Sequence, residues 1–137
     1  MATGTAAVAA RELKIQAAHY LRMTVNYSDT GISTGRPFAN YLPSGAVIEE
    51  VIVRIVTAFN AATTNVLTVG QNSSSYNDMV AAGDVDETTA GTTKVLRGAD
   101  LTISSDALPY VKYTQTGTAA TAGQAIIIIK YIPNNDL

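Results

Sequence analysis

The sequence has 137 residues, and it contains no cysteine, no tryptophan and only one histidine, His19. Without thiols the chain has no disulfide framework, no thiolate metal site and no cysteine nucleophile. A single histidine also excludes the zinc sites that are built from several imidazoles. We therefore predict that the protein is not an enzyme, and we predict no catalytic residues, no cofactor and no metal site.

Charged side chains are scarce as well, at 15% of the residues, and the net charge is −2. Globular proteins average about 25% charged residues. A nucleic-acid-binding domain needs a basic face, so we expect no direct nucleic-acid partner. A surface with so few charges suggests that other proteins cover part of it.

Long apolar runs are missing too. The longest run, residues 125–129, is far shorter than the about 20 residues of a membrane-spanning helix, so we expect no membrane partner. Residues 1–10 lack the basic start of a signal peptide and consist mainly of small side chains. We expect them to form a flexible N-terminal arm that orders only against a partner.

What the sequence does contain is 21 alanines, 18 threonines and an alternating apolar pattern. Residues 13–28 alternate with a period of two, which predicts a strand with one buried face. So long a strand should break near residues 17–18, and a helix over residues 6–20 is the alternative for its first half. His19 lies on the apolar side of this pattern, where we expect a core or subunit-interface residue.

Further strands are separated by turn residues. Residues 46–59 are partly apolar on both faces, so this strand should lie centrally or contact a partner, and residues 66–70 should return from it as a hairpin. Residues 71–93 form a long loop, rich in Ser, Asn, Asp, Gly and Thr, with room for a helical turn within 76–82. The remaining strands are expected at 93–96, 101–104, 110–115 and 124–132. The pattern predicts an all-β, antiparallel β-sandwich or barrel, with a single domain over residues 11–137.

The acidic residues of the long loop are Asp78, Asp84, Asp86 and Glu87. The spacing of Asp84 and Asp86 is similar to the start of a calcium-binding loop. However, Thr89 occupies the position that requires glycine, and Val95 occupies the position of the bidentate glutamate. We therefore expect a solvated acidic loop rather than a calcium site.

Other side-chain combinations that could form a site are sparse. Glu49 and Glu50 are neighbours on a predicted strand, so we expect them on opposite faces and not as an acid–base pair. Tyr110 and Tyr113 also fall on opposite faces, and the seven tyrosines form no flat stripe for stacking sugars or bases. One loop and one strand could still combine into a small aromatic platform.

Two stretches carry a family resemblance. Residues 42–53 read Leu-Pro-Ser-Gly-Ala-Val-Ile-Glu-Glu-Val-Ile-Val, and Thr-Ala-Phe and Val-Leu-Thr-Val-Gly follow at 57–59 and 66–70. Residues 110–133 then resemble a closing hairpin with a turn rich in Thr and Gly. Across residues 41–133 the sequence resembles a module of small structural proteins of tailed bacteriophages. It is most similar to capsid decoration (cement) proteins of the jelly-roll type.

The resemblance implies a jelly-roll-like sandwich that binds the major capsid protein on the outer surface of the phage head and stabilises the shell. It also implies a homo-oligomer, a dimer or a trimer, located in the virion and, during assembly, in the host cytoplasm. We expect the contacts in residues 2–10 and in loop 71–93. The alternative is a phage fibre, spike or adhesin module that binds carbohydrate, and the third hypothesis is a hydrolase that joins His19 to a carboxylate.

Overall fold

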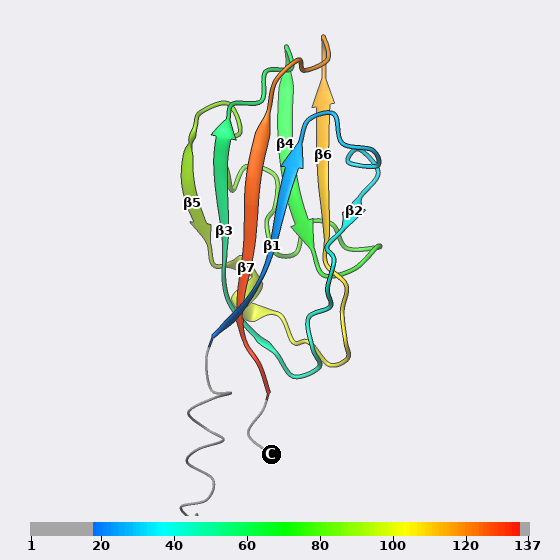
Figure 1. Cartoon of the computed structure of the whole chain (residues 1–137), viewed down its shortest axis with the longest axis vertical. Coiled ribbons are helices and arrows are strands. Elements are labelled where there is room, and N and C mark those ends of the chain that lie inside the picture. Colours follow the sequence, from blue (N-terminus) through cyan, green and yellow to red (C-terminus); the bar gives the residue numbers. More distant parts are fainter. Residues whose placement is uncertain (1–17, 135–137) are drawn as a thin grey trace, which may run out of the picture.

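A computed structural model describes residues 18–134, which form two stacked antiparallel sheets (Figure 1). The described elements are β1 (His19–Asn26), β2 (Arg36–Pro37), β3 (Val47–Thr57), β4 (Thr64–Gly70), β5 (Gly91–Val95), the 3₁₀ helix η1 (Arg97–Asp100), β6 (Tyr110–Thr116) and β7 (Gln124–Ile132). One sheet has the strand order β1-β7-β3-β5 and the other has the order β2-β6-β4. The predicted all-β, antiparallel sandwich is confirmed.

Consecutive strands lie in opposite sheets, which is the winding of a jelly roll. β1 and β3 belong to the four-stranded sheet, whereas β2 and β4 belong to the three-stranded sheet. An eight-stranded jelly roll has one more strand beside β4. Here the loop after β4 runs along that edge. Val80 and Val69 exchange backbone hydrogen bonds of 3.0 and 3.1 Å, and the Met79 amide also donates to the Val69 carbonyl at 3.0 Å.

The core lies between the two sheets, where every second residue of each long strand is buried. On β7, Ala125, Ile127 and Ile129 are fully buried and alternate with partly exposed neighbours. Val51, Val53 and Ile55 do the same on β3, which lies centrally between β7 and β5 as expected. Val69, Val111 and Tyr113 face them from the three-stranded sheet. The alternation that predicted strands is therefore also what builds the core.

Both predicted hairpins are wrong. The strands expected at 46–59 and 66–70 correspond to β3 and β4, and those expected at 110–115 and 124–132 correspond to β6 and β7. Each pair is divided between the two sheets. A turn signal shows that the chain reverses, but it does not show whether two strands pair edge to edge or stack face to face. Because both members of each pair carry a buried apolar row, stacking across the core buries both rows at once.

Two further expectations need correction. Residues 101–104 form no strand, although the Ile103 carbonyl accepts a hydrogen bond from the Gly45 amide at 2.7 Å. The helical turn within 76–82 is not formed, because Met79 and Val80 are fully buried and pair with β4 instead. β2 was not expected. The arm at 1–10, and most of the alternative helix at 6–20, lie outside the described residues.

A bulge in β3 overturns the expected placement of two glutamates. The pairing of β3 with β7 shifts register between Ile48 and Glu50. As a result Ile48 is buried, Val47 is 55% exposed, and the inward alternation resumes at Val51. Glu49 and Glu50 therefore do not point to opposite faces, since both reach lysines on the outer side of the sheet.

Candidate functional site

The outer side of the four-stranded sheet has apolar side chains at its centre. Ile52 on β3 and Ile128 on β7 are directly paired, and Ile126 lies one row further along β7. All three are only partly buried. An antiparallel sheet with one side in water normally carries polar residues on that side. This arrangement is typical of a sheet that another protein covers.

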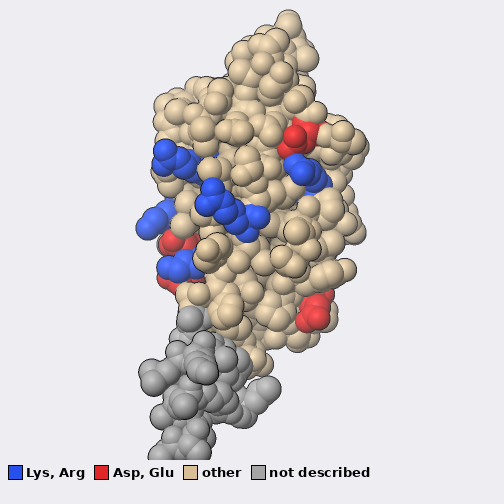
Figure 2. All heavy atoms as spheres, viewed as in Figure 1, with Lys and Arg blue, Asp and Glu red and all other residues tan. Residues whose placement is uncertain are grey.

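The side chains around these isoleucines are mainly cationic. Four of them carry a positive charge, and they are Arg22, Arg54, Lys94 and Lys130. Glu49 and Glu50 add two negative charges, so this surface has an excess of positive charge, whereas the whole chain has a net charge of −2. Figure 2 shows Lys and Arg gathered where β1, β7 and β3 face the viewer. We call the three isoleucines and four cations the isoleucine face.

The ion pairs on this surface are weak. Lys130 lies 3.5 Å from a carboxylate oxygen of Glu49, and Lys94 lies 3.9 Å from one of Glu50. The lysine side chains are 39% and 66% exposed, and such exposed pairs contribute at most about 1 kcal/mol. The lysines are therefore available to interact with a partner.

The isoleucine face also contains a shallow hollow. A hollow of about 270 Å³ lies between Tyr20, Arg22, Ile52, Ile128 and Lys130. The Tyr20 side chain is 65% exposed at its edge. Aromatic, isoleucine and arginine side chains around a concavity are the residue types that supply most of the energy at protein interfaces.

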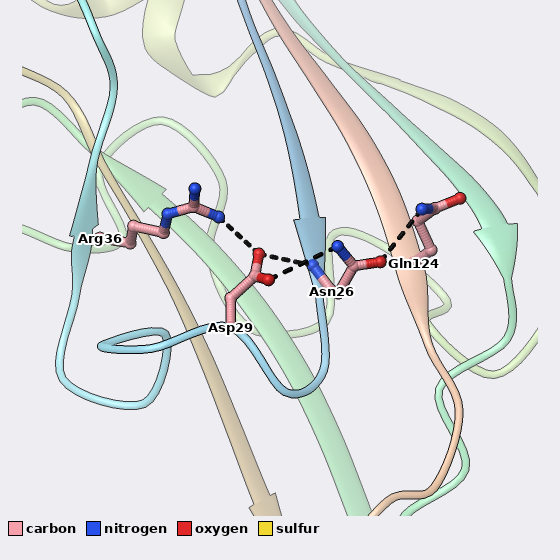
Figure 3. A network of polar contacts seen from close by, with 4 residues as sticks. All are labelled: Asn26, Asp29, Arg36 and Gln124. Carbon is pink, nitrogen blue, oxygen red and sulfur yellow. Dashed lines mark hydrogen bonds and ion pairs between the residues drawn. The ribbon is translucent and has the colours of Figure 1, made fainter.

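A polar network fixes the corner beside the isoleucine face (Figure 3). Asp29 accepts hydrogen bonds from the Asn26 backbone amide at 2.9 Å and from the Arg36 guanidinium, which is also an ion pair. The Gln124 amide of β7 donates to Asn26 Oδ1 at 3.0 Å. These bonds join the end of β1 to both β2 and β7, so the outer rows of β1 and β7 are held in register.

His19 does not lie in the core, contrary to one of the two expectations for it. It is exposed at the start of β1, and its ring centre is 5.9 Å from that of Tyr131. Residues 31–35 match the Gly-x-Ser-x-Gly pattern of hydrolase nucleophiles, but Ser33 is exposed in a turn after the far end of β1. Because β1 alone is about 25 Å long, His19 and Ser33 are not brought together. The hydrolase hypothesis requires a carboxylate beside His19, and among residues 18–134 no ion pair joins His19 to one.

Three of the four loop carboxylates have separate structural partners. Asp78 accepts hydrogen bonds from the backbone and side-chain amides of Gln71 at 2.9 and 2.8 Å. The Arg97 guanidinium donates two bonds of 2.8 Å to Asp84 and lowers the pKa of that carboxyl. Asp86 accepts bonds from Thr88, which lower its pKa. Within residues 18–134, no three His, Cys, Asp or Glu side chains are grouped closely enough to hold a metal ion.

Glu87 contradicts the expectation of a solvated acidic loop. Its exposure is 6%, and its carboxylate accepts a hydrogen bond from the Leu67 amide at 2.8 Å. Burial raises the pKa of this carboxyl. Met79 and Val80 of the same loop are also fully buried. A few residues of loop 71–93 therefore help to close the core, and the loop's expected role as a contact element remains a prediction for its exposed residues.

Comparison with known proteins shows the fold. No family model matches the chain, and no curated protein sequence matches it. A chain in the capsid asymmetric unit of cyanophage Pam1 matches with a TM-score of 0.60 and 19% identity, over 85% of this chain and 84% of that one. A chain in the acid-stable capsid of Helicobacter pylori bacteriophage KHP30 matches with a TM-score of 0.63 and 15% identity, over 84% and 86%. A chain in the capsid of Ralstonia phage GP4 matches with a TM-score of 0.57 and 19% identity, over 87% and 84%.

The matched chains are close to this one in length, because each alignment covers a similar share of both chains. The similarity thus extends over nearly the whole sandwich. Among the described residues, no helix has the length and apolar character to cross a membrane.

Proposed function

We propose that this chain is a structural protein of a bacteriophage virion that binds the outer surface of the capsid and stabilises the shell. The observation that carries this proposal is the match to three chains of similar length, each from a phage capsid structure, over 84% or more of both partners. The role requires no catalytic residues.

We assign the contact with the capsid to the isoleucine face. Covering Ile52, Ile126 and Ile128 removes apolar surface from water, which is the main favourable term in protein association. The surrounding cations would then pair with acidic groups of the major capsid protein and orient the contact. Many copies that bind only the assembled shell stabilise it by mass action.

The charge of this face argues against a second copy of the chain as its occupant. In a symmetric dimer, the same surface of both subunits meets itself. The cationic rim of one copy would then lie near the cationic rim of the other, and like charges at an interface are unfavourable. The predicted dimer or trimer would therefore use another surface, and a contribution of residues 2–10 to attachment remains a prediction.

Sedimentation with phage heads tests this function. Heads of the encoding phage that lack this protein are mixed with the purified 14.3 kDa chain and pelleted. We expect the chain to pellet in a fixed ratio to the major capsid protein and to raise the temperature at which the heads release DNA. A chain that remains in the supernatant, or that is found in the tail of native particles, would contradict the proposal.

A matched pair of variants tests the assigned face. Ile52→Thr removes an apolar group from the isoleucine face, whereas Val66→Thr makes a similar change on the outer side of the three-stranded sheet. Both side chains are partly buried, and both strands retain a β-branched residue. Ile52→Thr should weaken attachment and Val66→Thr should not. Equal effects would exclude the isoleucine face while leaving the capsid role intact.

A further inference from the structure

A polar groove lies at one end of the three-stranded sheet. It has a volume of about 580 Å³, which is within the usual size range of ligand sites. Its walls come from three separate segments: Tyr41 before β3, residues 71–73 after β4, and residues 102–110 leading into β6. We propose that this groove binds a neutral carbohydrate. The proposal goes beyond attachment to a capsid and does not depend on it.

The lining of the groove favours this class of ligand. Nine of its eleven residues carry a hydroxyl, amide or carboxyl group, and only Ala107 and Leu108 are apolar. Sugar hydroxyls both donate and accept hydrogen bonds, so they match a wall of Ser, Thr, Asn, Gln and Asp side chains. A lipid or another apolar ligand would find little apolar surface in this groove.

The charge of the groove further restricts the class of ligand. No lysine or arginine lines the groove, whereas Asp106 contributes a carboxylate. Phosphorylated, sulfated and other acidic ligands would therefore meet a negative group without a compensating cation. A neutral sugar is bound without that repulsion.

Tyr41 provides the aromatic surface on which a sugar ring can stack. Its side chain is 58% exposed although it lines the groove, and Tyr110 lines the same groove. A tyrosine combines a flat apolar ring with a hydroxyl, which suits a ligand with one apolar and one polar side. Tyr41 in a loop and Tyr110 at the start of β6 correspond to the small aromatic platform of one loop and one strand that the tyrosine spacing left open without locating it.

One wall of the groove is held in place before any ligand binds. The backbones of Leu42 and Ala107 exchange hydrogen bonds of 2.7 and 2.9 Å. Asp106 Oδ1 accepts a bond from the Ser44 amide at 2.9 Å, and the Ser44 hydroxyl donates to the Ser104 carbonyl at 3.0 Å. These bonds fix Tyr41 beside Asp106, which reduces the entropy lost on binding.

The opposite wall is also ordered by its own hydrogen bonds. Asn72 Oδ1 accepts bonds from the amides of Ser74 and Ser75 at 2.8 and 2.9 Å, so its side-chain nitrogen can donate to a ligand. The Gln71 side-chain amide donates to Asp78 at 2.8 Å, so its oxygen can accept. This wall thus presents both a donor and an acceptor to a ligand in the groove.

The groove and the isoleucine face belong to different sheets. Gln71 follows β4 and Tyr110 starts β6, both in the three-stranded sheet, whereas the isoleucine face is the outer side of the four-stranded sheet. A molecule attached by the isoleucine face would leave the groove accessible. Many attached copies would then raise the avidity for a surface that displays the sugar repeatedly.

An array of neutral and acidic oligosaccharides, probed with the purified full-length chain, tests the proposal. We expect binding to at least one neutral glycan. Tyr41→Ala should weaken this binding about tenfold, whereas Tyr41→Phe, which keeps the ring, should largely preserve it. Tyr20→Ala is the matched control, because it removes another exposed tyrosine from the other sheet.

Three results would overturn the proposal: no binding to any neutral glycan, binding restricted to acidic glycans, or equal binding by wild type and Tyr41→Ala. Thermal unfolding of each variant checks that the fold is intact. If Tyr41→Ala does not fold, Asn72→Ala removes a donor on the opposite wall and should also lower affinity. Absence of glycan binding together with normal attachment to heads would leave the proposed function unaffected. Absence of attachment together with normal glycan binding would leave the carbohydrate proposal unaffected.

Discussion

At the scale of single residues, Glu87 has the most unusual environment of the described carboxylates. It is the one buried charged or polar residue in residues 18–134, and its main interaction is the hydrogen bond from the Leu67 amide. Desolvation disfavours the ionised form and raises the pKa above its ordinary value of 4.5. The folded protein therefore holds this proton more tightly than the unfolded chain does.

This shift predicts a dependence of stability on pH. Between the unfolded pKa near 4.5 and the raised folded pKa, the native state binds more protons, so the contribution of Glu87 to stability falls as pH rises. Glu87→Gln keeps a hydrogen-bond acceptor but does not titrate. Urea unfolding from pH 4 to 7 should show wild type losing stability relative to Glu87→Gln. A difference that is constant with pH would contradict this account.

Gly70 illustrates a close backbone approach that only glycine allows. A Cβ atom at this position would lie 1.4 Å from the Ser75 carbonyl oxygen, which belongs to the backbone and cannot rotate away. Gly70→Ala should displace residues 71–75, cost about 1–3 kcal/mol of unfolding free energy and weaken glycan binding in the groove. Chemical denaturation and the glycan array measure the two effects.

Gly83→Ala is the control for Gly70→Ala. Gly83 has a φ of +89°, and a Cβ atom added there would meet no other atom within 4 Å, so alanine introduces only backbone strain of about 1–2 kcal/mol. Glycan binding should then be retained. Loss of binding in both variants would show that the effect of Gly70→Ala is not specific to the groove wall.

At the scale of elements, β7 contributes both to the core between the sheets and to the isoleucine face. Its isoleucine run is apolar on both sides, and neighbouring residues face different environments: Ile129 is fully buried between the sheets, whereas Ile128 is part of the isoleucine face. Identical substitutions at these two positions therefore separate packing from attachment.

Ile129→Ala should cost about 2–5 kcal/mol of unfolding free energy, because it leaves a cavity in the core. Ile128→Ala should cost about 1 kcal/mol, since its side chain is only partly buried, but it should weaken binding to heads. Urea unfolding and sedimentation with heads give the two values for each variant. Strong destabilisation by Ile128→Ala with unchanged attachment would contradict the roles assigned to β7.

The strands were predictable from sequence because alternation is local. β1, β3, β4, β6 and β7 all fall within or close to their predicted ranges. Their partners were not predictable, because the choice between pairing and stacking depends on the whole core. The bulge at Glu49 was also not predictable from the sequence, because one extra residue in a strand changes no local propensity. It nevertheless moves Val47 to the outer side of the sheet and Ile48 to the core side.

The candidate surfaces were predictable only in part. The apolar residues on both sides of 46–59 indicated either a central strand or a face that contacts a partner. However, the cations Arg22 and Lys94 join that face only through the register of β1 and β5. Tyr41 and Asp106 are far apart in sequence, and both line the groove because the backbones of Leu42 and Ala107 pair. No local signal marks a contact of that kind.

At the scale of the whole molecule, the distribution of charge predicts how attachment responds to salt. Positive charge is in excess on the isoleucine face although the chain is acidic. Charge attraction is largely screened when the Debye length falls from about 10 Å at 0.1 M salt to about 3 Å at 1 M. Attachment to heads should therefore weaken with salt without being abolished, because the apolar contact remains.

Lys130→Glu should reduce both the attachment and its dependence on salt. Lys112→Glu is the matched control, because it makes the same charge change on β6 in the other sheet, beside the ring of Tyr76. Sedimentation with heads across this salt range measures both variants. Equal losses would show that net charge, and not the isoleucine face, controls attachment.

Cryo-electron microscopy of phage heads saturated with the purified chain tests the central claim most directly. We predict sandwich-shaped density on the outside of the shell, with the sheet β1-β7-β3-β5 turned toward the capsid protein and the groove beside Tyr41 turned outward. Heads without added density, or density in which the three-stranded sheet contacts the shell, would contradict the account.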